Sequence, residues 1–183
     1  MDIVILVLFI IILIACIIFT LYMLSYNKFQ DVIIRINEVE AALDNNLRNK
    51  YDLLSRSVSI IKTKDEEVKI DAFEEIVKLR SRKIGNFDLD RKLINAKNEL
   101  LVYKDKDKEI ATNDEIKKIL KQLSEIDEHL DTQRDYYNKN ISLYNKMIKK
   151  FPENIVARFN KYEEKLYFDR RDMNDEDFED FKL

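Results

Sequence analysis

Residues 3–24 form an unbroken apolar run, IVILVLFIIILIACIIFTLYML, that contains no charged residue, glycine or proline. About 20 apolar residues suffice to cross the ~30 Å hydrocarbon core of a bilayer. Because the backbone in lipid must satisfy its own hydrogen bonds, such a segment has to be helical. Tyr22 and Tyr26 lie at its C-terminal end, where aromatic rings prefer the membrane interface. The run therefore predicts an N-terminal transmembrane anchor within residues 1–26.

Two other interpretations of the run are a cleaved signal peptide and a lipoprotein signal. A signal peptide has a basic start and a small-residue cleavage site, whereas only Met1 and Asp2 precede this run. Residues 13–16 (LIAC) are similar to a lipoprotein cleavage box, which would make Cys16 a lipidated N-terminus. Strongly apolar residues continue after Cys16, however. We therefore predict an uncleaved anchor in which Cys16 is a small apolar residue.

The charges on either side of the run predict its orientation. Lys28, Arg35 and Arg48 follow it, whereas Asp2 precedes it. An excess of Lys and Arg marks the cytoplasmic side of a membrane segment. We therefore predict a single-pass protein with its N-terminus outside and the rest of the chain in the cytoplasm.

The composition excludes several classes of protein. The 183 residues include one Gly and one Pro, too few for the turns of an all-β protein or for a Gly-rich phosphate loop. One Cys and one His (His129) cannot supply a disulfide or the usual four ligands of zinc. The formal net charge of -3 lacks the basic excess of a nucleic-acid-binding protein. We expect no cofactor, no metal, no nucleic acid and no enzymatic site.

Apolar residues recur every three or four positions in four segments after the anchor, as one face of a helix requires. The first segment continues from the anchor to about residue 61, and the last covers residues 114–150, ending at Phe151 and Pro152. The two middle segments are about half as long. This pattern predicts an all-α fold in which the transmembrane helix continues into an elongated antiparallel four-helix bundle over residues 27–168. The acidic residues 169–183 are predicted to be a disordered tail.

Local signals predict where the helices end. Thr63 begins a capping box, and Gly85, the only glycine, is expected to end the second helix in a left-handed conformation. Asp88 is expected to cap the third helix. Residues 104–109 (KDKDKE) predict a solvated connector, and Thr112 begins a second capping box before the last helix.

Tyrosine–asparagine pairs are the most distinctive local motif: Tyr26 with Asn27, Tyr137 with Asn138, and Tyr144 with Asn145. The last two pairs are seven residues apart and share a helix face. One interpretation is structural, with each Tyr packed and each Asn bonded to a neighbouring helix, and we favour it because buried polar groups need internal partners. The functional alternative is a polar seam near the membrane that binds a partner.

Arg134 interrupts the apolar stripe of the last long helix. We expect it to form an ion pair with Glu38 or Glu40 that sets the register of the helices. His129 is expected at the edge of the apolar face.

After Pro152, the residues Ile155, Phe159, Tyr162 and Leu166 continue a helical stripe. Charges of both signs surround this stripe, whereas a membrane-surface helix favours a basic polar face. We therefore predict that the stripe packs on the bundle. Contact with lipid is the alternative.

Several of these residues together resemble the LemA family of bacterial membrane proteins. The resemblance lies in Tyr26 and Asn27, in residues 50–54 (KYDLL, with Tyr51 and Asp52), in residues 134–145 (RDYYNKNISLYN), in Phe151 and Pro152, and in Val156 and Ala157. It implies an anchor followed by a helical bundle in the bacterial cell membrane, and it implies no catalytic residue. The sequence departs from the family pattern at residues 55–57 (SRS) and 103–105 (YKD).

The expected function is a membrane-anchored, non-enzymatic helical scaffold that binds another protein. The resemblance implies a membrane metalloprotease as one partner. The alternative is a lipid-interacting or membrane-remodelling protein that uses the stripe between Ile155 and Leu166.

Overall fold

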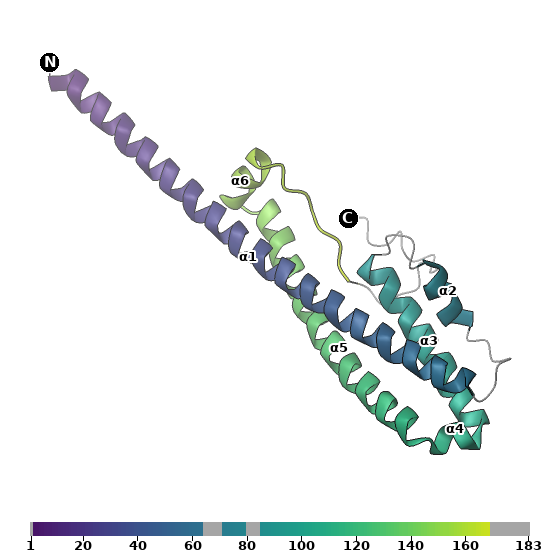
Figure 1. The fold of residues 1–183 in the computed structure, drawn as a ribbon. Helices are drawn as coiled ribbons and strands as arrows, with labels where there is room; N and C mark the ends of the chain where they lie inside the picture. Colours follow the sequence, from purple (N-terminus) through teal and green to yellow (C-terminus); the bar gives the residue numbers. More distant parts are fainter. Residues whose placement is uncertain (1, 64–70, 80–84, 169–183) are drawn as a thin grey trace. The chain divides into compact units, whose positions relative to one another are not determined.

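A computed structural model describes residues 2–63, 71–79 and 85–168, and every regular element in these ranges is a helix. The described residues form six helices (Figure 1), with these bounds: α1 Asp2–Lys62, α2 Asp71–Leu79, α3 Asn86–Lys106, α4 Lys108–Thr112, α5 Asp114–Lys149 and α6 Glu153–Phe159. The predicted all-α class is confirmed. The capping box predicted from Thr63 and the tail 169–183 extend outside the described residues.

The helix α1 runs without a break from the apolar run into the packed part of the protein. Its 61 residues correspond to about 92 Å at 1.5 Å per residue. The apolar run has its side chains exposed, and it is long and apolar enough to cross a membrane. Buried side chains begin further along the helix and recur every three or four residues: Ser25, Phe29, Val32, Ile36, Val39, Leu43 and Leu47. The change from uniform to periodic hydrophobicity therefore separates a candidate anchor from a core-forming helix.

The chain divides into two compact units, and α1 and α5 contribute to both. Among the described residues, the first unit contains residues 2–40 and 135–167. In it, Phe29 of α1 packs edge-on against Tyr144 of α5, with ring centroids 5.7 Å apart. Further along α1, Glu40 meets the earlier α5 residue Tyr137. The two helices are therefore antiparallel in this unit.

Among the described residues, the second unit contains residues 41–63, 71–79, 85–134 and Phe168. Here Asn46 bonds Gln133, and Arg56 bonds Glu115, so α1 and α5 are again antiparallel. The helix α3 contributes Leu93, Ala96 and Leu100 to the core, at the four- and three-residue spacing of one helix face. An ion pair between Lys92 and Glu75 joins α3 to α2.

Two of the predicted helix ends around α3 are wrong. Gly85 has a φ of -70° and a ψ of 152°, so it is extended and precedes α3 rather than ending α2 in a left-handed turn. It has no side chain that could cap α3, and Asp88 lies within the first turn. An isolated Gly suits an N-cap as well as a C′ position, so the residue type alone does not show whether it ends one helix or begins the next.

The predicted connector at residues 104–109 is largely helical. The helix α3 continues through Lys106, and the Asp107 carboxylate then accepts hydrogen bonds from the backbone N–H groups of Glu109 and Ile110 to start α4. Ile110 is completely buried and holds this short helix against the core. At the next junction Asn113, rather than Thr112, caps α5, because its side chain accepts from the N–H groups two and three residues on.

The helix after Pro152 is shorter than its apolar stripe suggested. It ends in a Schellman turn, in which the Tyr162 N–H donates to the Ala157 carbonyl and Lys161 adopts a φ of 54°. Val156 and Ala157 are buried, whereas Ile155, Phe159 and Leu166 of the predicted stripe are exposed. The prediction that this stripe packs on the bundle is therefore wrong, with the exception of the half-buried Tyr162.

Candidate functional site

Arg134 forms a buried ionic cluster in the second unit. One guanidinium nitrogen donates to Asp90 of α3 at 2.6 Å, and another donates to Asp131 at 2.7 Å. Arg134 and Asp90 are both nearly inaccessible to water. The Phe168 ring covers the guanidinium at 5.4 Å and also packs on Phe87. The predicted partners Glu38 and Glu40 are therefore wrong, since the third helix supplies the acid.

A second ionic cluster lies between three helices of the same unit. The Lys50 side chain is completely buried, and its ammonium lies 2.6 Å from the Asp127 carboxylate on α5. Lys97 of α3 binds the other carboxylate oxygen. Burial alone raises the pKa of Asp127, but the hydrogen bonds and charges of the two lysines outweigh it and hold that pKa below its usual value. One carboxylate therefore links α1, α3 and α5.

In the first unit, Tyr137 is buried, and its hydroxyl donates to the Glu40 carboxylate at 3.4 Å. Burial and the Glu40 charge raise the pKa of Tyr137 to about 12. Asn138 is half-buried on the same helix. Glu40, expected beside Arg134, thus bonds a tyrosine.

The third tyrosine–asparagine pair binds the segment that follows α6. Tyr144 is buried against Phe29 and Tyr162, and burial raises its pKa. The Asn145 amide donates to the Lys165 carbonyl and accepts from the Lys165 N–H, both at 2.9 Å. One asparagine side chain therefore satisfies both backbone groups of an otherwise irregular residue, as a strand partner would.

The remaining residues of the motifs occupy less buried positions. Tyr26 is half-buried and stacks on Tyr22, whereas Asn27 is exposed. Tyr51 is half-buried, and Asp52 is exposed. His129 and Phe151 are also exposed, and Pro152 is half-buried. The structure therefore does not gather these side chains into one site.

A polar contact that the sequence did not predict joins α6 to the region where the apolar run ends. Lys28 of α1 bonds the buried Glu153 carboxylate at 3.1 Å. Burial raises the pKa of Glu153, but a backbone hydrogen bond and the Lys28 charge outweigh it, so that pKa lies below its usual value. Asn160 donates to the Tyr22 hydroxyl, and the Phe159 ring packs edge-on against the Tyr22 ring at 6.5 Å. These contacts join residues that are 125 or more positions apart in the sequence, so no local sequence pattern predicts them.

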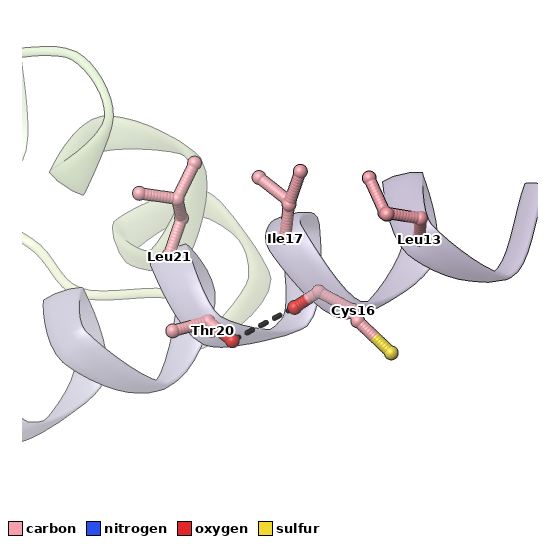
Figure 2. Close-up of a pocket in the computed structure, with 5 residues that line it drawn as sticks. All are labelled: Leu13, Cys16, Ile17, Thr20 and Leu21. Atoms are coloured by element: carbon pink, nitrogen blue, oxygen red, sulfur yellow. Dashed lines mark hydrogen bonds between the residues drawn. The ribbon is translucent and has the colours of Figure 1, made fainter. Parts of the chain in front are cut away.

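The apolar run itself carries a shallow depression lined by Leu13, Cys16, Ile17, Thr20 and Leu21 (Figure 2). All five residues belong to α1, so the depression is the surface of one helix rather than an enclosed pocket. The Thr20 hydroxyl donates to the Cys16 carbonyl at 2.8 Å. This bond satisfies the hydroxyl within the helix, as a threonine in lipid requires.

Among the described residues, no group of three or more His, Cys, Asp or Glu side chains is arranged to hold a metal ion. The buried charged side chains Lys50, Asp90, Arg134 and Glu153 instead bond side chains of other helices. Their arrangement can fix helix register and bind an irregular segment.

The comparisons with known proteins agree with the residues that carried the resemblance. No curated protein matched the chain. The sequence model of the LemA family matches residues 39–179, which is most of the chain and includes Tyr51, Arg134 and the last two tyrosine–asparagine pairs. The match begins after Tyr26 and Asn27. The chain therefore belongs to the LemA family.

Proposed function

We propose that this protein is a single-pass scaffold of the bacterial membrane that uses its helical part to bind another protein and catalyses no reaction. The observation that carries the proposal is the continuity of α1, which leaves the apolar run and enters the packed core as one helix. A binding surface on α5, which packs against α1 through the contact of Tyr144 with Phe29, is held at a defined position relative to the bilayer. The flanking charges favour a cytoplasmic location for this part.

The surface for a partner follows from which side chains remain exposed. Tyr144 and Asn145 are buried in internal contacts, so they do not supply it. Tyr136 and Leu143 of α5 are 46% and 42% exposed and lie seven residues apart on one helix face. Tyrosine is among the residues enriched at the centre of protein–protein interfaces, and Leu143 would extend an apolar contact beside it. A membrane metalloprotease is one candidate partner.

Site-specific photocrosslinking in intact cells tests this proposal. A photoreactive residue at Tyr136 or Leu143 is expected to give the same discrete crosslinked product. The matched control is Ser142, which is exposed on another side of α5. Equal products from all three positions, or none from Tyr136 and Leu143, would contradict a partner surface here.

A second candidate function is membrane remodelling through the segment after α5. The exposure of Ile155, Phe159 and Leu166 favours it, because these side chains are free to contact lipid. Electron microscopy of vesicles that contain the full-length protein distinguishes the two functions. Tubules or strongly curved vesicles would favour remodelling, and unchanged vesicles would favour the scaffold.

A further inference from the structure

The surface of α6 and of the turn before it combines exposed apolar side chains with basic ones. Phe151 is 70% exposed, Phe159 is 76% exposed, and Ile155 lies between them at 45%. The same helix is anchored by its buried residues Glu153, Val156 and Ala157. The exposed apolar side chains are therefore presented by a fixed element and not by a loose end.

The position of this surface is given by its contacts with α1. Tyr22 lies near the end of the apolar run, where a bilayer spanned by residues 3–24 has its interface. Tyr22 contacts Phe159 through its ring and Asn160 through its hydroxyl. Lys28, one turn beyond the run, bonds Glu153 at the other end of α6. Figure 1 shows α6 beside this part of α1. If α1 crosses a bilayer through residues 3–24, the surface of that bilayer therefore lies at the level of α6.

The charge of this region fits an anionic surface. Between positions 146 and 161 there is one acidic residue, Glu153, and five basic ones: Lys146, Lys149, Lys150, Arg158 and Lys161. All five basic side chains are exposed, although Lys149 also bonds Glu164. Glu163, Glu164 and Lys165 follow directly, so basic residues outnumber acidic ones by six to three when the stretch is extended to Lys165. Basic residues beside apolar ones are typical of helices that bind anionic lipid surfaces.

We propose that α6 and the preceding turn form a second contact with the bilayer, in which Phe151, Ile155 and Phe159 enter the interface and the neighbouring basic side chains bind anionic headgroups. This inference rests on the proposed function, because it requires α1 to cross the same membrane. The contact would give the protein two attachments to one leaflet. It would thereby restrict the tilt of the helical part against the bilayer.

Single tryptophan probes test the contact, because the chain contains no Trp. Full-length Phe159→Trp is reconstituted into phosphatidylcholine–phosphatidylglycerol vesicles whose acyl chains carry bromine at a shallow or a deep position. We expect strong quenching of Phe159→Trp by shallow bromines. The matched control Tyr136→Trp lies on α5, about 20 Å along the helix from its end at Lys149, and should not be quenched. An unquenched Phe159→Trp would overturn the proposed contact and leave the surface to a protein partner.

A third probe separates this inference from the anchor on which it depends. Ile12→Trp lies in the middle of the apolar run and is expected to be quenched by deep bromines. If Ile12→Trp is quenched and Phe159→Trp is not, the anchor holds and only the second contact fails. If Ile12→Trp is not quenched, the proposed membrane span itself fails.

The role of charge is tested in the Phe159→Trp background. Replacing the phosphatidylglycerol by phosphatidylcholine, or introducing Lys150→Glu with Arg158→Glu, should weaken the quenching by shallow bromines. Quenching that is the same in neutral and anionic vesicles and in both proteins would overturn the recognition of anionic headgroups.

Discussion

At the residue scale, Tyr137 makes the stability of the first unit sensitive to alkaline pH. Its pKa is raised from 10.0 to about 12 in the folded protein, because burial and Glu40 disfavour the phenolate. A raised pKa stabilises the folded state at pH below 10, and this contribution is lost as the pH rises from 10 to 12. The difference between the ordinary pKa of tyrosine and the raised pKa of Tyr137 in the folded protein corresponds to roughly 3 kcal/mol in the free energy of unfolding.

We therefore expect Tyr137→Phe to lose less stability than the wild type between pH 10 and 12. Urea unfolding of the detergent-solubilised protein, followed by circular dichroism, measures the difference. The neighbouring Tyr136→Phe is the matched control, because it removes a phenol that is 46% exposed, whereas the bond to Glu40 belongs to the buried Tyr137. Identical pH profiles for Tyr137→Phe and the wild type would contradict this explanation.

Lys161 is the second residue with a predicted effect on stability. It occupies the C′ position after α6 with a φ of 54°, a conformation that costs a residue with a Cβ about 1 kcal/mol and costs glycine little. Lys161→Gly should therefore raise the free energy of unfolding by about 0.5–1 kcal/mol. Lys161→Ala, which removes the same charge but keeps the Cβ, is the control. Equal stabilities of the Gly and Ala variants would show that the left-handed turn is not strained.

At the element scale, Asp127 connects α1, α3 and α5 through the buried Lys50 and the partly exposed Lys97. Asp127→Asn leaves the Lys50 ammonium buried without a counter-charge, so we expect a loss of about 3 kcal/mol in the free energy of unfolding. Glu125→Gln, an exposed acid on the same helix, should cost less than about 0.5 kcal/mol. Thermal or urea unfolding compares the two variants.

The same substitution should change the acid limb of the stability curve. The pKa of Asp127 is lowered from 3.8, so its contribution is present above pH 4 and is lost as the pH falls through the folded value. Asp127→Asn should therefore flatten the loss of stability below pH 4. If the acid limb of Asp127→Asn is as steep as that of the wild type, the two lysines do not stabilise the carboxylate.

The helices could be predicted from the sequence wherever an apolar stripe was long, as in α1, α3 and α5. The ends of α1 and α5 could be predicted as well, since the expected bounds, about residue 61 and residues 114–150, lie within one residue of Lys62 and of Asp114–Lys149. The residues that cap the helices around α3 and α4 could not, because Gly85, Asp107 and Asn113 fit more than one capping role. The buried ionic contacts could not be predicted either. Arg134 has acids at several possible registers, and only packing selects Asp90 on α3. Similarly, no local window relates Tyr22 to Phe159 of α6. Each residue belongs to a predicted feature, Tyr22 to the membrane interface and Phe159 to the apolar stripe after Pro152, but the contact between them follows only from the fold.

At the scale of the whole molecule, α1 and α5 pass through both compact units without a break. Unfolding either unit therefore removes packing from helices that the other unit also uses. Two single tryptophans can report on the units separately. Tyr136→Trp lies in the first unit, and the exposed Val102→Trp lies on α3 in the second.

We predict that both probes unfold in urea at the same midpoint, and that Asp127→Asn lowers both midpoints by the same amount although it changes only the second unit. The matched variant Glu125→Gln should leave both midpoints nearly unchanged. If Asp127→Asn lowers the midpoint at Val102→Trp alone, the two units unfold independently. In that case continuity of α1 would not transmit a change in one unit to the other, and a scaffold held by this helix could bind partners with each unit separately.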